Sequence, residues 1–234
     1  MKIGKKVGIV IGIVLAILLV LWYLQSQGLV KVFPTSDERA VKKIVEIDES
    51  KFSPAEGLSA ENYQAKIDEL YIARQEVLED PTNPNKWMLF GNILEFLNDH
   101  TKAIEAWEKV LEYQELNFAA AQNIATNYQY FLRDFEKAEE YYLKAFTGRP
   151  DYTPAYQGLM DLYRYNLTSK KDQYEPIVLQ AIKHDVTNAS SYYAALVDFF
   201  ADNGDFEKAR EYLDDVEATN PQAAATLRQD YPEL

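Results

Sequence analysis

Apolar and polar positions repeat together about every 35 residues between Pro81 and Pro221. Three segments open with an aspartate and reach an alanine four residues later: Asp99–Ala103, Asp134–Ala138 and Asp205–Ala209. In each, a bulky side chain follows the alanine after four residues, and a small or branched one follows after three more. This spacing places these side chains on one side of an α-helix. The pattern therefore predicts a helix after each aspartate.

A second helix is predicted before each of these, most clearly in the segment Trp87-x2-Phe90-Gly91-x2-Leu94. The small residue lets two helix backbones approach closely, while the large side chains fill the space between them. The combined pattern, W-x2-(L/F)-G-x2-(Y/L)…A-x3-(aromatic)…P, resembles the tetratricopeptide repeat (TPR). The resemblance implies an all-α fold, in which antiparallel helix pairs stack as an α-solenoid and share a continuous core.

We expect four such repeats over residues 84–221. Their predicted bounds are 84–117, 118–152, 153–189 and 190–221. The second repeat contains one extra residue near Phe131, which is expected to lengthen its turn. The third departs most from the pattern, since Tyr174 stands where an alanine is expected and Pro176 falls in the first turn of a helix. Proline is tolerated at that place in a helix.

Segments on both sides of the array are predicted to cover its ends. Residues 25–56 form a linker with a short helix, which begins at the capping-box sequence Thr35–Glu38. Residues 57–83 are expected to form an N-terminal capping helix, and residues 222–234 a C-terminal capping helix or tail. An array without such caps would expose apolar surface at its ends.

The N-terminus combines a basic tail, residues 1–6, with an uncharged apolar run, residues 7–24. At 1.5 Å per residue the run covers roughly 27 Å, about the thickness of a bilayer core, so we expect a transmembrane anchor. A cleaved signal peptide is the alternative, but its apolar run is usually about 7 to 15 residues. The lysines before the run favour a single-pass protein with a cytoplasmic N-terminus and an extracytoplasmic repeat body. Such a body would face the periplasm or the exterior of a bacterial cell.

Small residues recur at every fourth position of the N-terminal segment: Gly4, Gly8, Gly12 and Ala16. This spacing predicts a packing face on which the anchor pairs with itself or with another membrane protein, giving a homo- or hetero-oligomer. The alternative is that glycine is simply frequent in membrane helices.

Acidic residues outnumber basic ones by 37 to 24, and the net charge is −13 at pH 7. This balance argues against nucleic acid as a partner. The chain has no cysteine, and its two histidines, His100 and His184, are expected in a solvated turn and near a helix end. No glycine-rich phosphate loop, nucleophile motif or metal motif is found. We therefore expect no enzyme activity, no cofactor and no metal site.

The TPR resemblance implies that the first helix of each repeat lines a groove for extended peptides. The positions that would face the ligand, carried over residue by residue, are Met88, Asn92, Glu95, Phe96, Gln122, Asn123, Thr126, Gln129, Tyr130, Gln157, Asp161, Arg164, Tyr165 and Asp198. Their amides can bond a peptide backbone and their aromatic rings can hold apolar side chains. The alternative is that an exposed polar groove has no ligand.

The resemblance also suggests which peptides fit. Asn92 and Asn123 match the two asparagines of a clamp that some TPR proteins use to bind a chaperone tail, but Met88, Pro154 and Gly158 replace its basic residues. A terminal carboxylate is therefore disfavoured. A neutral or basic extended segment is expected, because the aspartates at 161, 198 and 202 outnumber the single arginine at 164.

Two classes of function fit these patterns. The first is a membrane-anchored adaptor that binds extended polypeptides or assembles an envelope complex. The second is a permanent structural subunit of a membrane complex without cycling clients. A cytosol-facing import receptor is a further alternative, and it requires the opposite orientation in the membrane.

Overall fold

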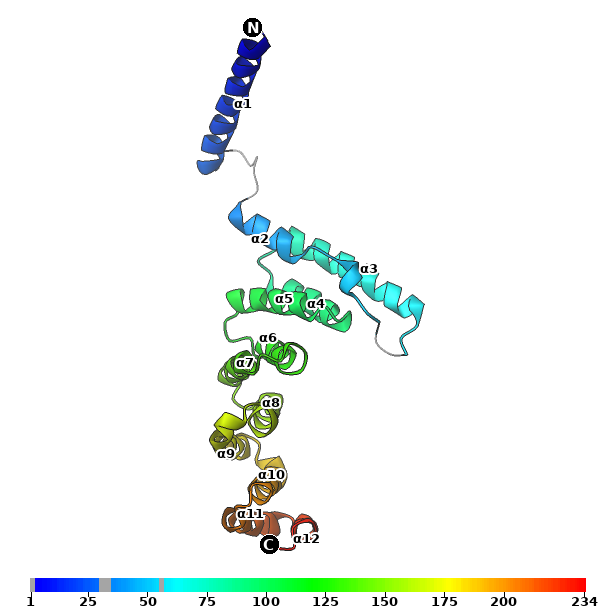
Figure 1. Cartoon of the computed structure of the whole chain (residues 1–234), viewed down its shortest axis with the longest axis vertical. Helices are drawn as coiled ribbons and strands as arrows, with labels where there is room; N and C mark the ends of the chain where they lie inside the picture. The colour runs from blue at the N-terminus through cyan, green and yellow to red at the C-terminus, as the bar shows by residue number, and fades with distance from the viewer. Residues whose placement is uncertain (1–2, 30–34, 55–56) are drawn as a thin grey trace. The chain divides into compact units, whose positions relative to one another are not determined.

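The computed structural model describes residues 3–29, 35–54 and 57–234, with side chains in the first range from residue 11 onward. All regular structure in these residues is helical (Figure 1). The chain divides into two units, Met1–Ile47 and Asp48–Leu234. The predicted all-helical class is confirmed.

The first unit contains helix α1, Ile3–Ser26, and helix α2, Ser36–Ile44. The predicted capping box begins α2: the Thr35 hydroxyl accepts from the Glu38 backbone N–H at 3.1 Å, and the Glu38 carboxylate accepts from the Thr35 backbone N–H at 3.1 Å. These two bonds satisfy N–H groups that a helix start leaves without partners.

The prediction of a transmembrane anchor over residues 7–24 is wrong. Among the described residues, no helix combines the length and the apolar character that crossing a membrane requires. The predicted single-pass membrane localisation depended on this anchor and is wrong with it.

The small-residue face of the N-terminal segment depended on the same prediction. The surroundings of Gly4 and Gly8 lie outside the described side chains. A Cβ added at Gly12 would meet no atom within 4 Å. The basic tail, residues 1–6, lies partly outside the described residues, since these begin at residue 3.

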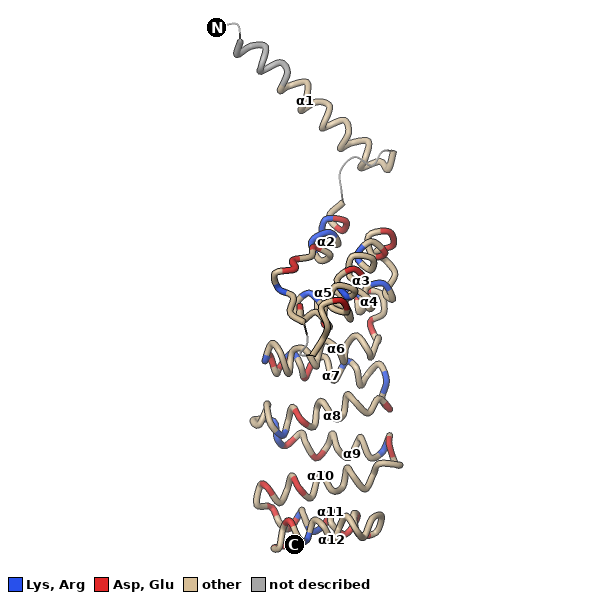
Figure 2. The backbone as a smooth tube through the Cα atoms, turned by 90° about the vertical axis from the view of Figure 1, so that its right-hand side faces the viewer, with Lys and Arg blue, Asp and Glu red and all other residues tan. Residues whose placement is uncertain are grey.

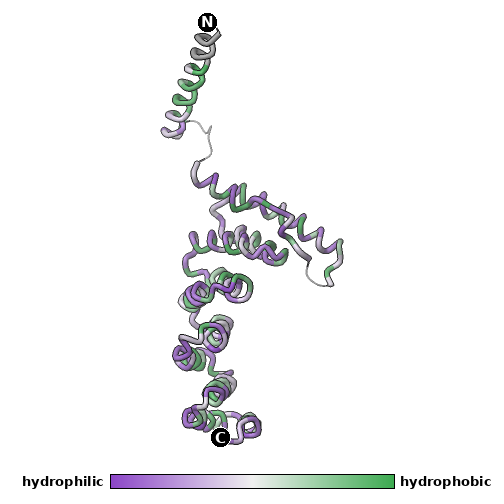
Figure 3. Tube along the Cα trace, viewed as in Figure 1, coloured by the Kyte–Doolittle hydropathy of each residue, from purple (hydrophilic) through white to green (hydrophobic). Residues whose placement is uncertain are grey.

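The second unit is a series of helix pairs that contact one another in chain order, as Figure 1 shows for α3 to α12. Its α-helices are α3 (Ala60–Glu79), α4 (Pro84–Phe96), α5 (His100–Tyr113), α6 (Phe118–Asn127), α7 (Phe135–Gly148), α8 (Thr153–Asp161), α9 (Tyr174–His184), α10 (Ala189–Asp202), α11 (Phe206–Thr219) and α12 (Pro221–Asp230). Short 3-10 turns are η1 (Glu49–Lys51), η4 (Thr168–Gln173) and η5 (Val186–Asn188). Hydrophobic and hydrophilic residues alternate along these helices, as expected where each is packed on its neighbours (Figure 3).

The repeated aspartates cap the second helix of three pairs. The carboxylates of Asp99, Asp134 and Asp205 each accept a hydrogen bond at 3.2 Å from the backbone N–H three residues later. This is the N-cap arrangement for which aspartate is favoured. The alanines four residues after these caps are fully buried in α5, α7 and α11. The repeat of the sequence is therefore a repeat of the fold.

Large side chains pack directly on glycines where helices cross. A Cβ on Gly91 would lie 2.6 Å from Nε1 of Trp107, and a Cβ on Gly158 would lie 2.3 Å from ring carbons of Tyr142. Both ring side chains are 1% exposed. The first contact is within a repeat and the second joins one repeat to the next.

The second and third repeats each contain a π-helical turn, in which hydrogen bonds span five residues and one extra residue is accommodated. These turns are η2 (Tyr128–Leu132) and η3 (Leu162–Asn166). The extra residue near Phe131 was expected to lengthen the turn between the two helices. It is instead accommodated in the π turn η2 at the end of the first helix. The turn in the third repeat was not predicted. In that repeat Tyr174 begins α9 and its ring stacks on Phe199 at 4.1 Å.

Helices at both ends of the array cover it. Helix α3 packs against α4, and α12 packs against α10 and α11. The linker is tied to the first repeat through Asn98, whose Nδ2 donates to the backbone oxygen of Ser53 at 2.8 Å.

Asp and Glu are spread along the whole second unit (Figure 2).

Candidate functional site

Two asparagines from adjacent repeats meet on the face formed by the first helices of the repeats, α4, α6, α8 and α10, which we call the A-helix face. Nδ2 of Asn123 on α6 donates to Oδ1 of Asn92 on α4 at 3.3 Å. The indole Nε1 of Trp107 donates to the same oxygen at 3.1 Å. Since an indole N–H can only donate, it fixes which side of the Asn92 amide is the oxygen. Asn92 in turn fixes the amide of Asn123.

This orientation leaves one amide donor and one amide acceptor of the asparagine pair without a hydrogen bond. Among the described residues, Nδ2 of Asn92 and Oδ1 of Asn123 have no hydrogen-bond partner. Asn92 is exposed and Asn123 is partly exposed. The pair can therefore accept one hydrogen bond and donate another to a group on the surface.

A hollow of about 360 Å³ adjoins the pair. Its lining residues are Asn92, Glu95, Trp107, Asn123, Thr126 and Asn127. They come from α4, α5 and α6, so the hollow exists only where the first two repeats meet.

Asn127 is the buried polar residue of this hollow, with 2% of its surface exposed. Its Nδ2 donates to the backbone oxygen of Asn123 at 3.0 Å, and its Oδ1 has no partner among the described residues. Because a carbonyl can only accept, Nδ2 must be the atom that faces Asn123. The atom left without a partner is therefore the oxygen. The sequence reasoning missed Asn127, although it stands at the helix position that buried Ile93 occupies in the first repeat.

Glu95 supplies the charge of the hollow. Its Oε2 lies 2.9 Å from Nδ1 of His100, and the His100 ring stacks on Phe131 with 3.6 Å between ring centres. A carboxylate accepts, so Nδ1 of His100 carries the proton in this bond. His100 was expected in a solvated turn, and it is instead partly buried as a support for Glu95.

Gln129 does not face the surface, although it was predicted as a groove residue. It is 1% exposed; its Oε1 accepts from the Tyr142 hydroxyl at 2.6 Å, and its Nε2 donates to Oδ1 of Asn166 at 2.9 Å. Gln129 lies in η2, where the π turn changes the direction of the side chains. It links the second repeat to the third as a core residue. Gln122 is partly buried and its Nε2 lies 3.4 Å from Oγ1 of Thr126.

A second polar cluster is formed by side chains of η2, α8, η3 and α10 together with Tyr231, which directly follows α12. The Tyr130 hydroxyl donates to Asp161 at 3.4 Å, Arg164 donates to Asp202 at 2.5 Å, and the Tyr231 hydroxyl donates to the other oxygen of Asp202 at 2.9 Å. The only positive charge in this set is already paired with Asp202.

Burial changes the acidity of this cluster. Partial burial raises the pKa of Asp161, against the hydrogen bond from Tyr130 and the charge of Arg164. The pKa of Asp198 is also raised by burial, with Arg164 acting against it and the charge of Asp202 acting with it. Carboxylates held in this way gain most from a cation that enters the cluster.

The other predicted positions are placed as follows: Phe96, Gln157 and Tyr165 are exposed, and Met88 and Thr126 are partly buried. Nζ of Lys66, on α3, lies 5.6 Å from the centre of the Phe96 ring, so the capping helix approaches the start of the A-helix face. The guanidinium of Arg164 lies 5.4 Å from the Tyr165 ring. The structure therefore brings Asn92, Glu95 and Asn123 together in one place and Asp161, Arg164 and Asp198 in another.

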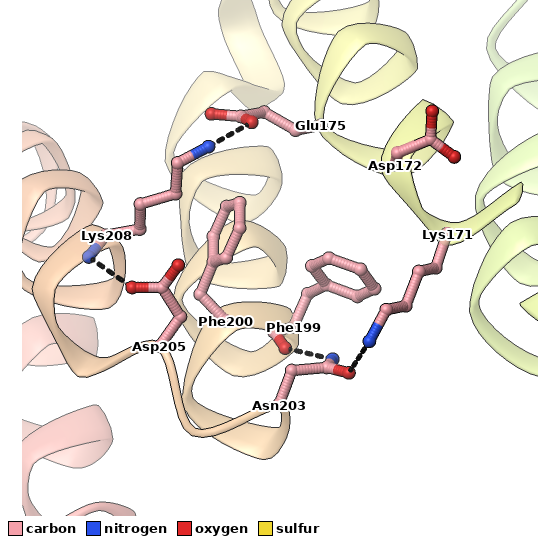
Figure 4. A pocket seen from close by; sticks show the side chains of 8 residues that line it. All are labelled: Lys171, Asp172, Glu175, Phe199, Phe200, Asn203, Asp205 and Lys208. Atoms are coloured by element: carbon pink, nitrogen blue, oxygen red, sulfur yellow. Dashed lines mark hydrogen bonds and ion pairs between the residues drawn. The ribbon is translucent and has the colours of Figure 1, made fainter.

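Another hollow, of about 340 Å³, lies at the turns of the third and fourth repeats, and Figure 4 shows its side chains. Phe199 and Phe200 form its apolar part. Lys171 donates to Asn203 at 3.3 Å, and Lys208 donates to Glu175 at 2.5 Å. These bonds join the two repeats, and they use the charged groups internally. We therefore read this hollow as a structural junction.

Metal chemistry is not suggested by the described part of the chain, which holds no group of three or more His, Asp or Glu side chains suited to an ion.

Comparison with known proteins agrees with this architecture. Residues 87–115, from α4 through α5, match the tetratricopeptide repeat. No curated protein matches the sequence.

Three solved structures have a similar fold. MamA residues 41-end from Desulfovibrio magneticus RS-1 is 14% identical, with 80% of this chain and 98% of that chain covered and a TM-score of 0.52. YrrB, described as a TPR protein with an unusual peptide-binding site, is 16% identical, with 72% and 86% covered and a TM-score of 0.54. PilF of Pseudomonas aeruginosa is 16% identical, with 85% and 95% covered and a TM-score of 0.50. The predicted TPR-like solenoid is confirmed by the matched repeat and by these folds.

Proposed function

We propose that this protein is a scaffold that binds an extended polypeptide segment along its A-helix face. The observation that carries the proposal is the pair of asparagines from adjacent repeats, Asn92 and Asn123, whose amides are oriented by the buried indole of Trp107. Side-chain amides held in a fixed orientation before a ligand arrives lose little conformational entropy on binding.

The pair matches the chemistry of a peptide backbone. Each residue of an extended peptide, except proline, presents one N–H donor and one C=O acceptor. Nδ2 of Asn92 can donate to a backbone carbonyl, and Oδ1 of Asn123 can accept from a backbone N–H. Recognition of this kind depends on the peptide being extended, and it leaves sequence preference to neighbouring pockets.

The charges of the A-helix face favour a neutral or basic segment. Asp161 and Asp198 have no full counter-charge, because Arg164 is paired with Asp202. A free C-terminal carboxylate is disfavoured. Gly158, one of the positions where a clamp for such a carboxylate carries a basic residue, is buried against Tyr142.

The similarity to YrrB adds support, since that TPR protein has a similar fold and an unusual peptide-binding site. Helix α4, which carries the first part of the predicted groove, lies mostly within the segment that matches the tetratricopeptide repeat. Helix α6, which carries the next part, follows that segment directly.

The test uses the full chain and a random library of 12-residue peptides displayed on phage. The selected peptides are synthesised, and their affinity for the parent and for Asn92→Ala/Asn123→Ala is measured by fluorescence anisotropy. We expect the double substitution to weaken binding by about 1–3 kcal/mol, the usual cost of a hydrogen-bonding group left without a partner. The matched control is Gln180→Ala/Gln229→Ala, which removes two exposed amides from α9 and α12.

Stability must be measured in parallel, because Asn92→Ala also leaves the buried Trp107 indole without its acceptor. Urea unfolding of each variant separates this effect from the effect on binding. Equal affinity of the parent and the folded Asn92→Ala/Asn123→Ala variant for every selected peptide would show that the A-helix face is not the binding surface.

A further inference from the structure

The hollow beside the asparagine pair offers mainly hydrogen-bond acceptors. These are the carboxylate of Glu95 and Oδ1 of Asn123; Asn127, whose Oδ1 is buried and has no partner among the described residues, also lines the hollow. The donors on its lining that remain after the bonds of Trp107, Asn123 and Asn127 described above are Nδ2 of Asn92 and the hydroxyl of Thr126. A ligand that fits this set must donate several hydrogen bonds and carry positive charge.

The feature that points most directly to a ligand is the buried Oδ1 of Asn127, which has no hydrogen-bond partner among the described residues. A buried carbonyl oxygen without a partner costs about 1–3 kcal/mol, and native proteins keep few of them. The position does not require a polar residue for packing, since Ile93 fills it in the first repeat with 5% of its surface exposed. In the second repeat, Nδ2 of Asn127 donates to the backbone oxygen of Asn123. This bond holds the Asn127 side chain so that its Oδ1 points away from Asn123.

We infer that this hollow is a subsite for an arginine side chain of the bound polypeptide. A guanidinium group has five N–H donors in one plane and no acceptor. Two of them can bind the Glu95 carboxylate side by side, and others remain for Asn127 and Asn123. A lysine ammonium has three donors around a point and cannot match this planar arrangement. The volume, about 360 Å³, lies within the range of roughly 300–1,000 Å³ that holds small ligands.

The inference rests on the proposed function, because it adds a side-chain subsite to the same peptide surface. Asn92 and Asn123 belong both to the pair that would hold the backbone and to the lining of the hollow. A peptide bonded to the pair would therefore place a neighbouring side chain at the mouth of the hollow. The hydrogen bond with His100 holds the Glu95 carboxylate in place. The lining of the hollow contains no lysine or arginine that would neutralise this carboxylate.

The experiment is a titration of the full chain with N-acetyl-L-arginine N-methylamide, followed by NMR at the indole N–H signal of Trp107. That indole lines the hollow, and its signal can be assigned with Trp22→Phe and Trp107→Phe variants. The expected result is a saturable shift for the arginine compound. The matching citrulline and lysine compounds, which lack the charge or the planar fork, should bind about tenfold more weakly or worse.

Glu95→Gln keeps the shape of the side chain and should also weaken arginine binding about tenfold, as expected for loss of a hydrogen bond to a charged group. Glu140→Gln removes the same charge from an exposed position on α7 and should leave binding unchanged. Asn127→Leu provides a second variant that removes the unpartnered oxygen. Equal binding of arginine and citrulline, no saturable shift at Trp107, or parent-like binding by Glu95→Gln would each overturn the inference.

The outcome is separable from that of the proposed function. If library peptides bind in a manner that depends on Asn92 and Asn123 while the arginine compound does not bind, the peptide surface stands and the arginine subsite is wrong. If the arginine compound saturates the hollow while the selected peptides ignore the asparagine pair, the hollow is a guanidinium site and the peptide surface is wrong.

Discussion

The indole Nε1 of Trp107 donates to Oδ1 of Asn92 at 3.1 Å, which links a side chain of the core to one on the A-helix face. Trp107 is 1% exposed and Asn92 is exposed. Through this one bond, the packing of α4 on α5 sets the direction of the amides that would meet a ligand. Mutations in the core of the first repeat can therefore change binding without touching the surface.

Trp107→Phe should weaken peptide binding while the protein stays folded. Phenylalanine fills much of the same space, so we expect a loss of roughly 1–2 kcal/mol in the free energy of unfolding, less than the roughly 3–5 kcal/mol expected for Trp107→Ala. The Asn92 amide loses its fixed donor, and we expect a several-fold loss of affinity for selected peptides by anisotropy. Trp87→Phe is the matched control. That indole is equally buried, but it donates to the backbone oxygen of Pro81 at 2.8 Å. A similar loss of affinity in both variants would contradict the role of Trp107.

Gly91→Ala and Gly158→Ala should each destabilise the array by about 1–3 kcal/mol through overpacking. The added Cβ would lie 2.6 Å from Trp107 in the first case and 2.3 Å from Tyr142 in the second. This cost opposes the roughly 1 kcal/mol that alanine gains over glycine in a helix. Urea unfolding measures the net effect, and Gln157→Ala at the exposed neighbouring position serves as control. Stabilisation by both alanines would show that the helices are not as close as the structure has them.

The bond between Gln129 and Tyr142 should appear as a coupling energy. Tyr142→Phe leaves Oε1 of Gln129 without its donor, and Gln129→Leu leaves the Tyr142 hydroxyl without its acceptor. Each should cost about 1–3 kcal/mol. The double variant should cost less than the sum by about 0.5–3 kcal/mol in a double-mutant cycle of unfolding free energies. Additive effects, together with a loss of peptide affinity in Gln129→Leu, would instead place Gln129 on the ligand side.

Asp161→Asn should increase the stability of the protein relative to the parent, and this gain should grow as the pH rises. Partial burial raises the pKa of Asp161 above its ordinary value of 3.8, so the native state holds this proton more tightly than the unfolded state does. Its contribution to stability is therefore most favourable below pH 3.8 and falls as the pH rises through the native pKa. Urea unfolding of parent and variant between about pH 4 and pH 7 should show a difference that grows with pH in favour of the variant. The effect should be small, since part of the side chain contacts solvent. The exposed Asp214→Asn is the control, and a difference that shrinks with pH would contradict the burial of Asp161.

The sequence by itself determined the helix pairs and their repeat. The signals are local: an aspartate that caps a helix start, an alanine four residues later and an apolar stripe at helical spacing each act within about two turns of chain. Asp99, Asp134 and Asp205 could therefore be placed correctly before any contact between repeats was known. The proximity of Asn92 and Asn123 also follows from this repeat, because the first helices of adjacent units lie side by side.

Only the tertiary structure decided which polar side chains are buried and which remain available. Whether an extra residue lengthens a loop or forms a π turn depends on which side chains then pack against the next repeat. This choice turned Gln129 from a predicted surface residue into a bridge to Tyr142 and Asn166. The unpartnered oxygen of Asn127 and the support of Glu95 by His100 likewise depend on side-chain geometry in the folded array. The prediction of a membrane span was wrong, since no helix of the described residues combines the required length and apolar character. Local patterns determine helices through short-range hydrogen bonds and propensities, whereas burial and partner choice depend on contacts between residues far apart in the chain.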